Sequence, residues 1–294
     1  MATVTAPSAT TSPPAPQGAQ IGRSASQASR SAFAALLLRD LSVLKKNLGE
    51  FIPRTLIQPF LLVFVFLYVF PKIGQGVGGG RSGGESFFAT ILVAGVVGLS
   101  IMFQGIQSVA LPMVQEFGYT KEIEDRVLAP LPVSMVALAK VTSGAIQGLL
   151  AALLVFPIAA VVPANPVHLQ VSWPVLLTLA PLACIAASAL GLTFGTRFEP
   201  RTVPMMFGVV VIPLTFLGCV YYSWVALTPI KVAGISWLKI LVLVNPLVYM
   251  SEGFRAALTN ANHMSLLAVY GVLTGFAALF LYFGINGFKK RVLS

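Results

Sequence analysis

Residues Phe87 to Ala110 read FFATILVAGVVGLSIMFQGIQSVA, an apolar run that contains no Asp, Glu, Lys, Arg or His. About 20 such residues, coiled as an α-helix, cross the ~30 Å hydrocarbon layer of a bilayer. Between Ile52 and Gly287 the chain repeats runs of this kind, and most of its charged residues lie in the short connectors between them. The pattern predicts a bundle of membrane-spanning helices.

The overall composition points to the same class. Of the 294 residues, 56% are hydrophobic and 10% are charged, and the mean hydropathy is +0.87. A soluble domain carries about 25% charged residues, so we expect an all-α polytopic membrane protein. The net charge of +10 is scattered over the ends of the apolar runs. This distribution indicates topology determinants and not a nucleic-acid-binding face.

Six spans are predicted. In this arrangement 14 of the 19 Lys and Arg residues fall on one side of the membrane. The positive-inside rule then places both termini in the cytoplasm. The six predicted spans are Ile52–Phe70, Phe87–Ala110, Val141–Val162, Trp173–Gly195, Val203–Leu227 and Ser265–Gly287.

Two segments precede the first span. Residues 1–30 are rich in Ala, Ser, Thr, Pro and Gln, a composition that cannot bury a core, and we expect a disordered cytoplasmic tail. From Ser31 to Gly49 apolar residues recur at three- and four-residue spacing among basic ones. This pattern predicts an amphipathic helix at the cytoplasmic membrane interface, with a soluble core helix as the alternative.

The stretch from Thr228 to Met264 has an apolar core that is too short to span and is broken at Asn245-Pro246. A seventh span would also move the basic C-terminus to the outer side, so we expect a re-entrant or interfacial helical hairpin there. Glu252 and Arg255 are three residues apart and can pair; a local ion pair is favoured over a substrate contact. The residues assigned to this outer hairpin are Asn245, Pro246, Tyr249, Glu252 and Arg255.

The densest charge lies between the second and third spans. Here Tyr119, Ile123 and Val127 form one apolar edge, and two oppositely charged pairs stand at four-residue spacing on the other face. These features predict a short surface helix suited to dock into a cleft on a soluble partner, with a solvated loop as the alternative. The residues assigned to coupling are Glu116, Gly118, Tyr119, Lys121, Glu122, Ile123, Asp125, Arg126 and Pro132.

The spans lack the carboxylate or His that binds a coupling ion in proton- or sodium-driven transporters. An ion-coupled carrier or channel is therefore the second hypothesis. Gln58, Gln104 and Gln107 are its possible polar path, although buried amides more often bond across helices. Driving energy is instead expected to enter through the charged connector.

Catalytic and cofactor motifs are missing from the sequence. The glycine-rich stretch Gly74–Gly84 has neither the Lys nor the strand of a P-loop, so ATP, if used, is bound by another polypeptide. His168 and His263 have no zinc-binding spacing, which argues against a membrane enzyme and a metal site. Cys184 and Cys219 are expected to be inert packing residues.

The connector pattern Glu116...Gly118...Glu122...Arg126...Leu131-Pro132-Val133, followed by Lys140, resembles the corresponding segment of type-2 (ABC-2) ABC exporter permeases, such as drug-resistance and polysaccharide export subunits. The Asn-Pro-Leu...Arg stretch at 245–255 resembles a second segment of that family. The resemblance covers residues 31–294 and implies one ABC-2 transmembrane permease domain in the inner or plasma membrane.

The same resemblance implies a half-transporter without enzymatic residues. Two permease subunits, identical or homologous, would work with separate ABC ATPase subunits that bind ATP and Mg²⁺. The apolar and aromatic spans favour an amphiphilic or lipid-like substrate. By family analogy this is a drug or an envelope lipid moved outward, as in drug efflux, with a lipid-linked glycan as the alternative.

Overall fold

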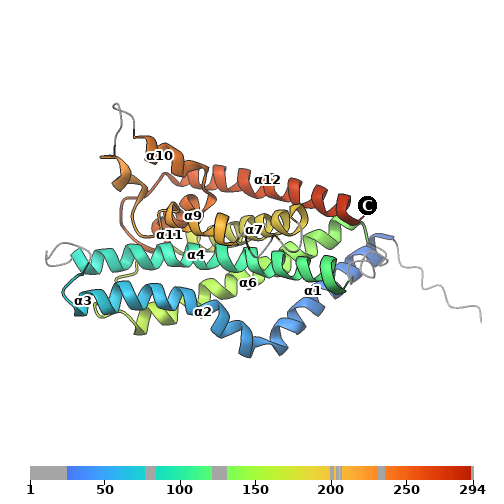
Figure 1. The fold of residues 1–294 in the computed structure, drawn as a ribbon, viewed down its shortest axis with the longest axis horizontal. Coiled ribbons are helices and arrows are strands. Elements are labelled where there is room, and N and C mark those ends of the chain that lie inside the picture. The colour runs from blue at the N-terminus through green and yellow to red at the C-terminus, as the bar shows by residue number, and fades with distance from the viewer. Residues whose placement is uncertain are drawn as a thin grey trace, which may run out of the picture.

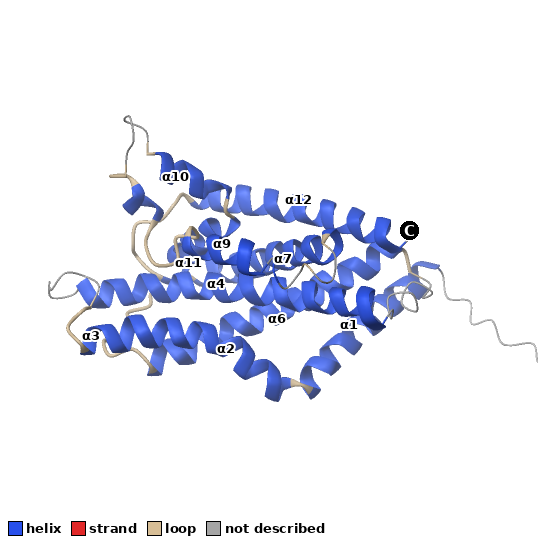
Figure 2. Ribbon diagram, in the orientation of Figure 1, coloured by secondary structure: helices blue, strands red, loops and turns tan. Residues whose placement is uncertain are grey.

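The structure, a computed structural model, describes residues 25–76, 84–120, 131–198, 202, 205, 207–230 and 236–292. Within these residues every regular element is a helix (Figure 2). The long helices run side by side (Figure 1). Helix α1 (Ala25–Lys46) and the C-terminus of α12 (Leu266–Val292) lie at one end of the bundle. Helices α3 (Phe70–Lys72) and α10 (Trp237–Leu241) lie at the other, so we call these the α1 end and the α10 end.

Five helices in the described part of the chain are long and apolar enough to cross a membrane. They correspond to the first four predicted spans and to the sixth. The first and second are built on α2 (Leu48–Phe64) and α4 (Gly84–Gln115), which continue beyond those bounds. The five candidate spans are Leu48–Lys72, Ser86–Gly118, Val133–Val161 (α6), Trp173–Arg197 (α7) and Leu266–Val292 (α12).

The predicted fifth span, Val203–Leu227, is not one continuous helix. Helical structure in residues 207–216 consists of a π-helical turn followed by α9 (Ile212–Phe216). Three residues later Cys219 adopts a left-handed backbone conformation with φ of 54°. Its carbonyl accepts a hydrogen bond from the Arg255 guanidinium. The helix ends here because Arg255, which is distant in sequence, binds the Cys219 carbonyl. In a longer helix this carbonyl would accept a hydrogen bond from within the helix.

Helix α4 occupies the centre of the bundle. In its most apolar window 72% of the residues are buried inside the protein, against 17% for α12. It packs against α2, α6, α7 and α11. Helix α7 approaches α4 closely at Gly191. A Cβ atom added to Gly191 would lie only 2.8 Å from the Ile106 carbonyl oxygen. Small residues at such contacts let membrane helices pack backbone to backbone.

Helix α1 begins at Ala25, which corrects the predicted start at Ser31 and shortens the expected tail. Residues 25–30 include Ala, Gln and Arg and no Gly or Pro, so extending the helix through them costs little; residues 1–24 lie outside the described part. Helix α1 ends at a break at Asn47 and forms a V with α2 (Figure 1). Phe33 and Leu36 of α1 pack against a hydrophobic cluster to which α4, α6, α7 and α12 contribute, and α1 contacts α6 directly.

The predicted hairpin segment, Thr228–Met264, contains α10, a 3-10 turn and α11 (Pro246–Leu258). All residues of α11 are buried, and the helix packs against α4, α7 and α12. Asn245 has an extended backbone and separates the 3-10 turn from α11. Its side chain accepts a hydrogen bond from the Leu247 N–H. A 13-residue helix is too short to cross a bilayer, so α11 is an internal element of the bundle.

Candidate functional sites

A buried ion pair anchors the start of the charged connector. Lys140, in the second turn of α6, places its Nζ 2.6 Å from a Glu116 carboxylate oxygen and 3.8 Å from one of Asp40. The Lys140 and Glu116 side chains are 7% and 8% exposed. Removing one member of such a pair leaves a buried uncompensated charge, so the pair fixes the turn that follows α4 relative to α6 and α1.

The remaining predicted coupling residues are placed only in part. Gly118 lies in the π-helical turn Glu116–Thr120 that ends the second span, and Pro132 is the residue before α6, with an extended ψ of 137°. The backbone of Tyr119 belongs to the same π-helical turn, but its side chain is outside the described part. Also outside it are Lys121, Glu122, Ile123, Asp125 and Arg126.

A cavity of about 510 Å³ opens at the α1 end, between α1, α2, α4 and α6. Its volume lies within the ~300–1,000 Å³ typical of small-molecule sites. Its wall combines charged, amide and apolar side chains. The lining residues are Arg39, Asp40, Val43, Leu44, Asn47, Glu50, Phe51, Arg54, Gln107, Ser108, Leu111, Pro112, Gln115, Glu116, Lys140, Ser143 and Gln147.

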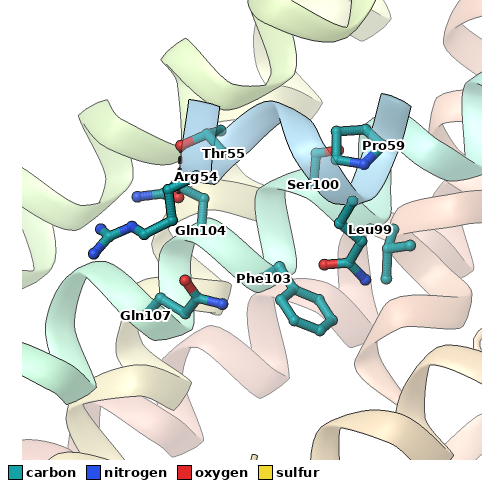
Figure 3. Close-up of a pocket in the computed structure, with 9 residues that line it drawn as sticks. Arg54, Thr55, Pro59, Leu99, Ser100, Phe103, Gln104 and Gln107 are labelled. Atoms are coloured by element: carbon teal, nitrogen blue, oxygen red, sulfur yellow. Dashed lines mark hydrogen bonds between the residues drawn. The ribbon is translucent and has the colours of Figure 1, made fainter. Parts of the chain in front are cut away.

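A smaller pocket of about 20 Å³ lies between α2 and α4 and shares Arg54 and Gln107 with the wall of this cavity (Figure 3). Space of this size holds about one water molecule. The pocket brings together the three predicted polar-path residues, Gln58, Gln104 and Gln107. Gln104 accepts a hydrogen bond from the Thr55 hydroxyl at 3.1 Å, drawn as a dashed line in Figure 3, and donates one to Gln147 at 3.4 Å. One of the three amides thus bonds across α2, α4 and α6.

A second buried ion pair organises the α10 end. The Arg255 guanidinium lies 2.6 Å from the Glu252 carboxylate, and both side chains are fully buried. The carboxylate also accepts hydrogen bonds from the backbone N–H groups of Trp224 at 2.7 Å and Met264 at 2.9 Å. Arg255 donates to the carbonyl of Cys219, before the Trp224 turn. The pair therefore ties α11 to the segment after α9 and to the approach to α12.

The other predicted hairpin residues support the same region. The Asn245 amide donates to the Leu214 carbonyl of α9 at 2.7 Å, and Pro246 opens α11 at the position where its missing N–H is harmless. The Tyr249 hydroxyl donates to the Leu243 carbonyl at 2.9 Å. The structure thus brings all five hairpin residues into one buried region that joins α11 to α9 and to the 3-10 turn Val242–Val244.

No group of three metal-binding side chains occurs among the residues that the structure describes. His168 lines a separate cavity of about 390 Å³ at the α10 end, together with Gln170 and Asn260. The His263 ring lies against the Met264 carbonyl, 2.8 Å from a ring nitrogen. The two histidines therefore lie in different surroundings.

Comparison with known proteins identifies the family. Residues 31–259 match the family model described as "ABC-2 type transporter", which is more than half of the chain. The chain belongs to the ABC-2 type transporter family. This ABC-2 protein is 30% identical over 191 residues to the inner membrane transport permease YadH of Escherichia coli (strain K12), a match that covers 64% of this chain and 70% of that relative. The YadH proteins of Escherichia coli O157:H7 and Shigella flexneri match to the same extent.

Family membership makes this ABC-2 protein a transmembrane transport subunit and not an enzyme. The sequence analysis missed several residues around its α1-end cavity. Arg54 was counted only as a topology determinant, and Glu50 and Gln147 were not singled out. Gln147 carries the signal that marked Gln104, an amide inside an apolar run. Nothing local marks Glu50 and Arg54, because their place beside the cavity depends on the bend between α1 and α2.

Proposed function

We propose that this chain is the permease subunit of an ATP-driven exporter that moves an amphiphilic molecule outward. The observation that carries the proposal is the α1-end cavity, a mixed polar and apolar space whose wall includes the ion pair anchoring the charged connector. A force applied to the connector would reach the cavity wall through Glu116 and Lys140. No Asp, Glu, Lys, Arg or His lies deep within a candidate span of the described residues, which supports an external source of energy.

The orientation follows from the distribution of basic residues. Helix α12 ends at the α1 end with Lys289, Lys290 and Arg291, while Lys72 and Lys239 lie at the α10 end. The positive-inside rule supports a cytoplasmic α1 end with both termini inside. The name of the YadH relatives supports placement in the inner membrane.

The expected partners are an ABC ATPase and a second permease subunit, identical or homologous. The ATPase would bind ATP and Mg²⁺ and receive the connector as a coupling helix. The buried Glu116–Lys140 pair gives this helix a fixed base at the end of α4. On the other face of the membrane, the Glu252–Arg255 connection would hold the outer hairpin that shapes the exit.

The substrate class is argued from the cavity. Side chains such as Leu44, Phe51 and Leu111 offer apolar contact, and Arg54 and Gln107 offer polar contact. This combination suits an amphiphile, either a drug or an envelope lipid. A lipid-linked glycan shares the same lipid portion and is the alternative cargo.

Reconstitution with and without energy sources tests the function. Proteoliposomes holding the permease and an ATPase co-purified with it in mild detergent should transport a fluorescent amphiphile only with hydrolysable ATP. The variant Glu122→Lys should insert normally but stimulate the ATPase less, because it reverses a charge on the expected docking face. Transport by the permease alone, driven by a pH gradient without ATP, would refute the proposal.

A further inference from the structure

The two neighbouring cavities at the α1 end share Arg54 of α2 and Gln107 of α4 in their walls. Figure 3 shows Arg54 on α2 and Gln107 on the neighbouring helix α4, both of which line the smaller pocket. Within the described part of the chain, neither the Arg54 guanidinium nor the Gln107 amide has a hydrogen-bond or ion-pair partner. Such groups at a cavity wall are available to a ligand.

Of the charged side chains in the wall of the larger cavity, which include Arg39 and Asp40, Arg54 is the one that also lines the smaller pocket. Lys140 in the same wall is neutralised by Glu116 at 2.6 Å. Glu50 lies one helical turn before Arg54 on α2, about 6 Å nearer the α1 end along the helix axis. An anion is therefore favoured beside Arg54, with Glu50 one turn nearer the α1 end.

A phosphate group matches these donors. A guanidinium presents a planar fork of N–H groups that binds phosphate through two parallel hydrogen bonds, and a carboxamide adds another donor. Phe51 and Leu111 in the cavity wall provide apolar contact for the first part of an acyl chain. We propose that Arg54 and Gln107 bind the phosphate of an amphiphile's headgroup in the α1-end cavity. The binding site itself does not depend on the proposed export function. Only the identification of the bound amphiphile as the exported cargo rests on that function.

Binding to the purified permease in detergent, without an ATPase, tests the proposal. Three probes separate the sources of the phosphate: 1-palmitoyl lysophosphatidic acid, 1-palmitoyl glycerol with the same chain and no phosphate, and glycerol 3-phosphate with no chain. We expect lysophosphatidic acid to bind at least tenfold more tightly than either of the others. Equal binding of palmitoyl glycerol, or equal binding of glycerol 3-phosphate, overturns the proposal.

Substitutions then locate the site. Arg54→Gln keeps hydrogen-bonding capacity but loses the charge, and we expect about tenfold to a hundredfold weaker binding of lysophosphatidic acid. Gln107→Leu should weaken binding about threefold to tenfold, and Glu50→Gln should tighten it because a like charge is removed. Lys46→Gln removes an exposed charge from the end of α1, outside the cavity wall, and is the matched control.

The outcomes separate this inference from the proposed function. At about 0.15 M salt, where charges more than about 8 Å apart are screened, Lys46→Gln should bind as the unaltered protein does. Equal losses in Arg54→Gln and Lys46→Gln would show a general surface-charge effect and overturn the site. ATP-driven transport that persists while Arg54→Gln binds normally would refute the phosphate site and leave the exporter standing. Selective binding without any ATP-driven transport would support the site and refute the exporter.

Discussion

Arg255 and Glu252 form a charged pair that is fully enclosed in the protein. The pair joins segments that are far apart in sequence. Arg255 donates to the Cys219 carbonyl after α9, and Glu252 accepts from the Met264 N–H before α12. Taking two charges out of water is costly, and their attraction offsets that cost only when the geometry is good and the other polar atoms are satisfied. The intact pair therefore adds little net stability, but the loss of either partner would leave the other charge buried and isolated.

The substitution Glu252→Leu should destabilise the protein by about 3–5 kcal/mol, because it leaves Arg255 buried without its counter-ion. Glu252→Gln should cost less, since the amide oxygen can still accept from one backbone N–H. Thermal unfolding followed by size-exclusion chromatography in detergent measures both. Lys72→Gln, at an exposed position at the end of α3, is the control and should change stability little. A Glu252→Leu protein as stable as the control would contradict the structural role of the pair.

At the scale of elements, contacts between helices explain features that single runs do not show. Helices α4 and α7 meet along Gly105, Ala187 and Gly191, where backbones approach closely. In a bilayer, such contact is stabilised mainly by close packing and hydrogen bonds, because lipid chains are as apolar as the helix surfaces. Glycine positions that face another helix should therefore be sensitive, and those that face open space should not.

Gly191→Ala should destabilise the helix bundle by about 1–3 kcal/mol, because the new Cβ would lie 2.8 Å from the Ile106 carbonyl oxygen and force α4 and α7 apart. Gly271→Ala is the matched control, since no atom lies within 4 Å of a Cβ built at this position of α12. Resistance to unfolding in increasing denaturing detergent compares the two variants. Equal behaviour would show that the α4–α7 contact is looser than described.

The anchor of the connector gives a second prediction at this scale. Lys140→Met removes the cation that binds Glu116, whereas Lys140→Arg keeps a charge at the same place. We expect Lys140→Met to lower stimulation of a partner ATPase about tenfold and Lys140→Arg to retain most of it, because the base of the connector stays fixed only with the ion pair. The measurement is ATP hydrolysis by the co-purified complex in lipid. Full stimulation with Lys140→Met would separate the ion pair from coupling.

At the scale of the whole molecule, the two ends differ in charge and in structure. The α1 end carries the basic C-terminus of α12 and the large cavity, and the α10 end carries the short helices α10 and α11. This asymmetry allows a topology to be tested with one residue at each end. Both native cysteines are buried, so we expect them to react little with a thiol-labelling reagent.

Ile240→Cys and Leu38→Cys place single reactive thiols on opposite ends, at side chains that are 60% and 62% exposed in the structure. A membrane-impermeant maleimide added to intact cells should label Ile240→Cys on α10 and leave Leu38→Cys on α1 unlabelled. Opening the cells should make Leu38→Cys reactive. The reverse pattern would invert the orientation and place the cavity and the connector outside.

Sequence reasoning reached the parts of the fold that depend on local composition. The spans around α2, α4, α6, α7 and α12 follow from uninterrupted apolar runs, since one helix crosses a bilayer on the strength of its own residues. The helix predicted at Ser31–Gly49, which the structure ends at Lys46, and the break at Asn245-Pro246 were also visible, because periodicity and proline act within a few residues. The pairing of Glu252 with Arg255 followed from their spacing on one helix.

The same reasoning failed where contacts between distant residues decide the structure. Residues 203–227 are apolar enough for a span, yet the helix stops at Phe216 and Arg255 binds the carbonyl of Cys219, which is 36 positions away in sequence. The early start of α1 at Ala25 was missed because the composition of residues 1–30 was averaged over the whole segment.

By itself, the sequence determined a multi-spanning helical membrane protein and the motifs that mark its family, because hydrophobic length and short-range spacing are properties of neighbouring residues. Only the tertiary structure decided that α11 is enclosed, that Glu116 meets Lys140 and that Arg54 and Gln107 face one cavity. These features depend on how helices bend and pack, and the contacts that fix this packing join residues from separate parts of the chain.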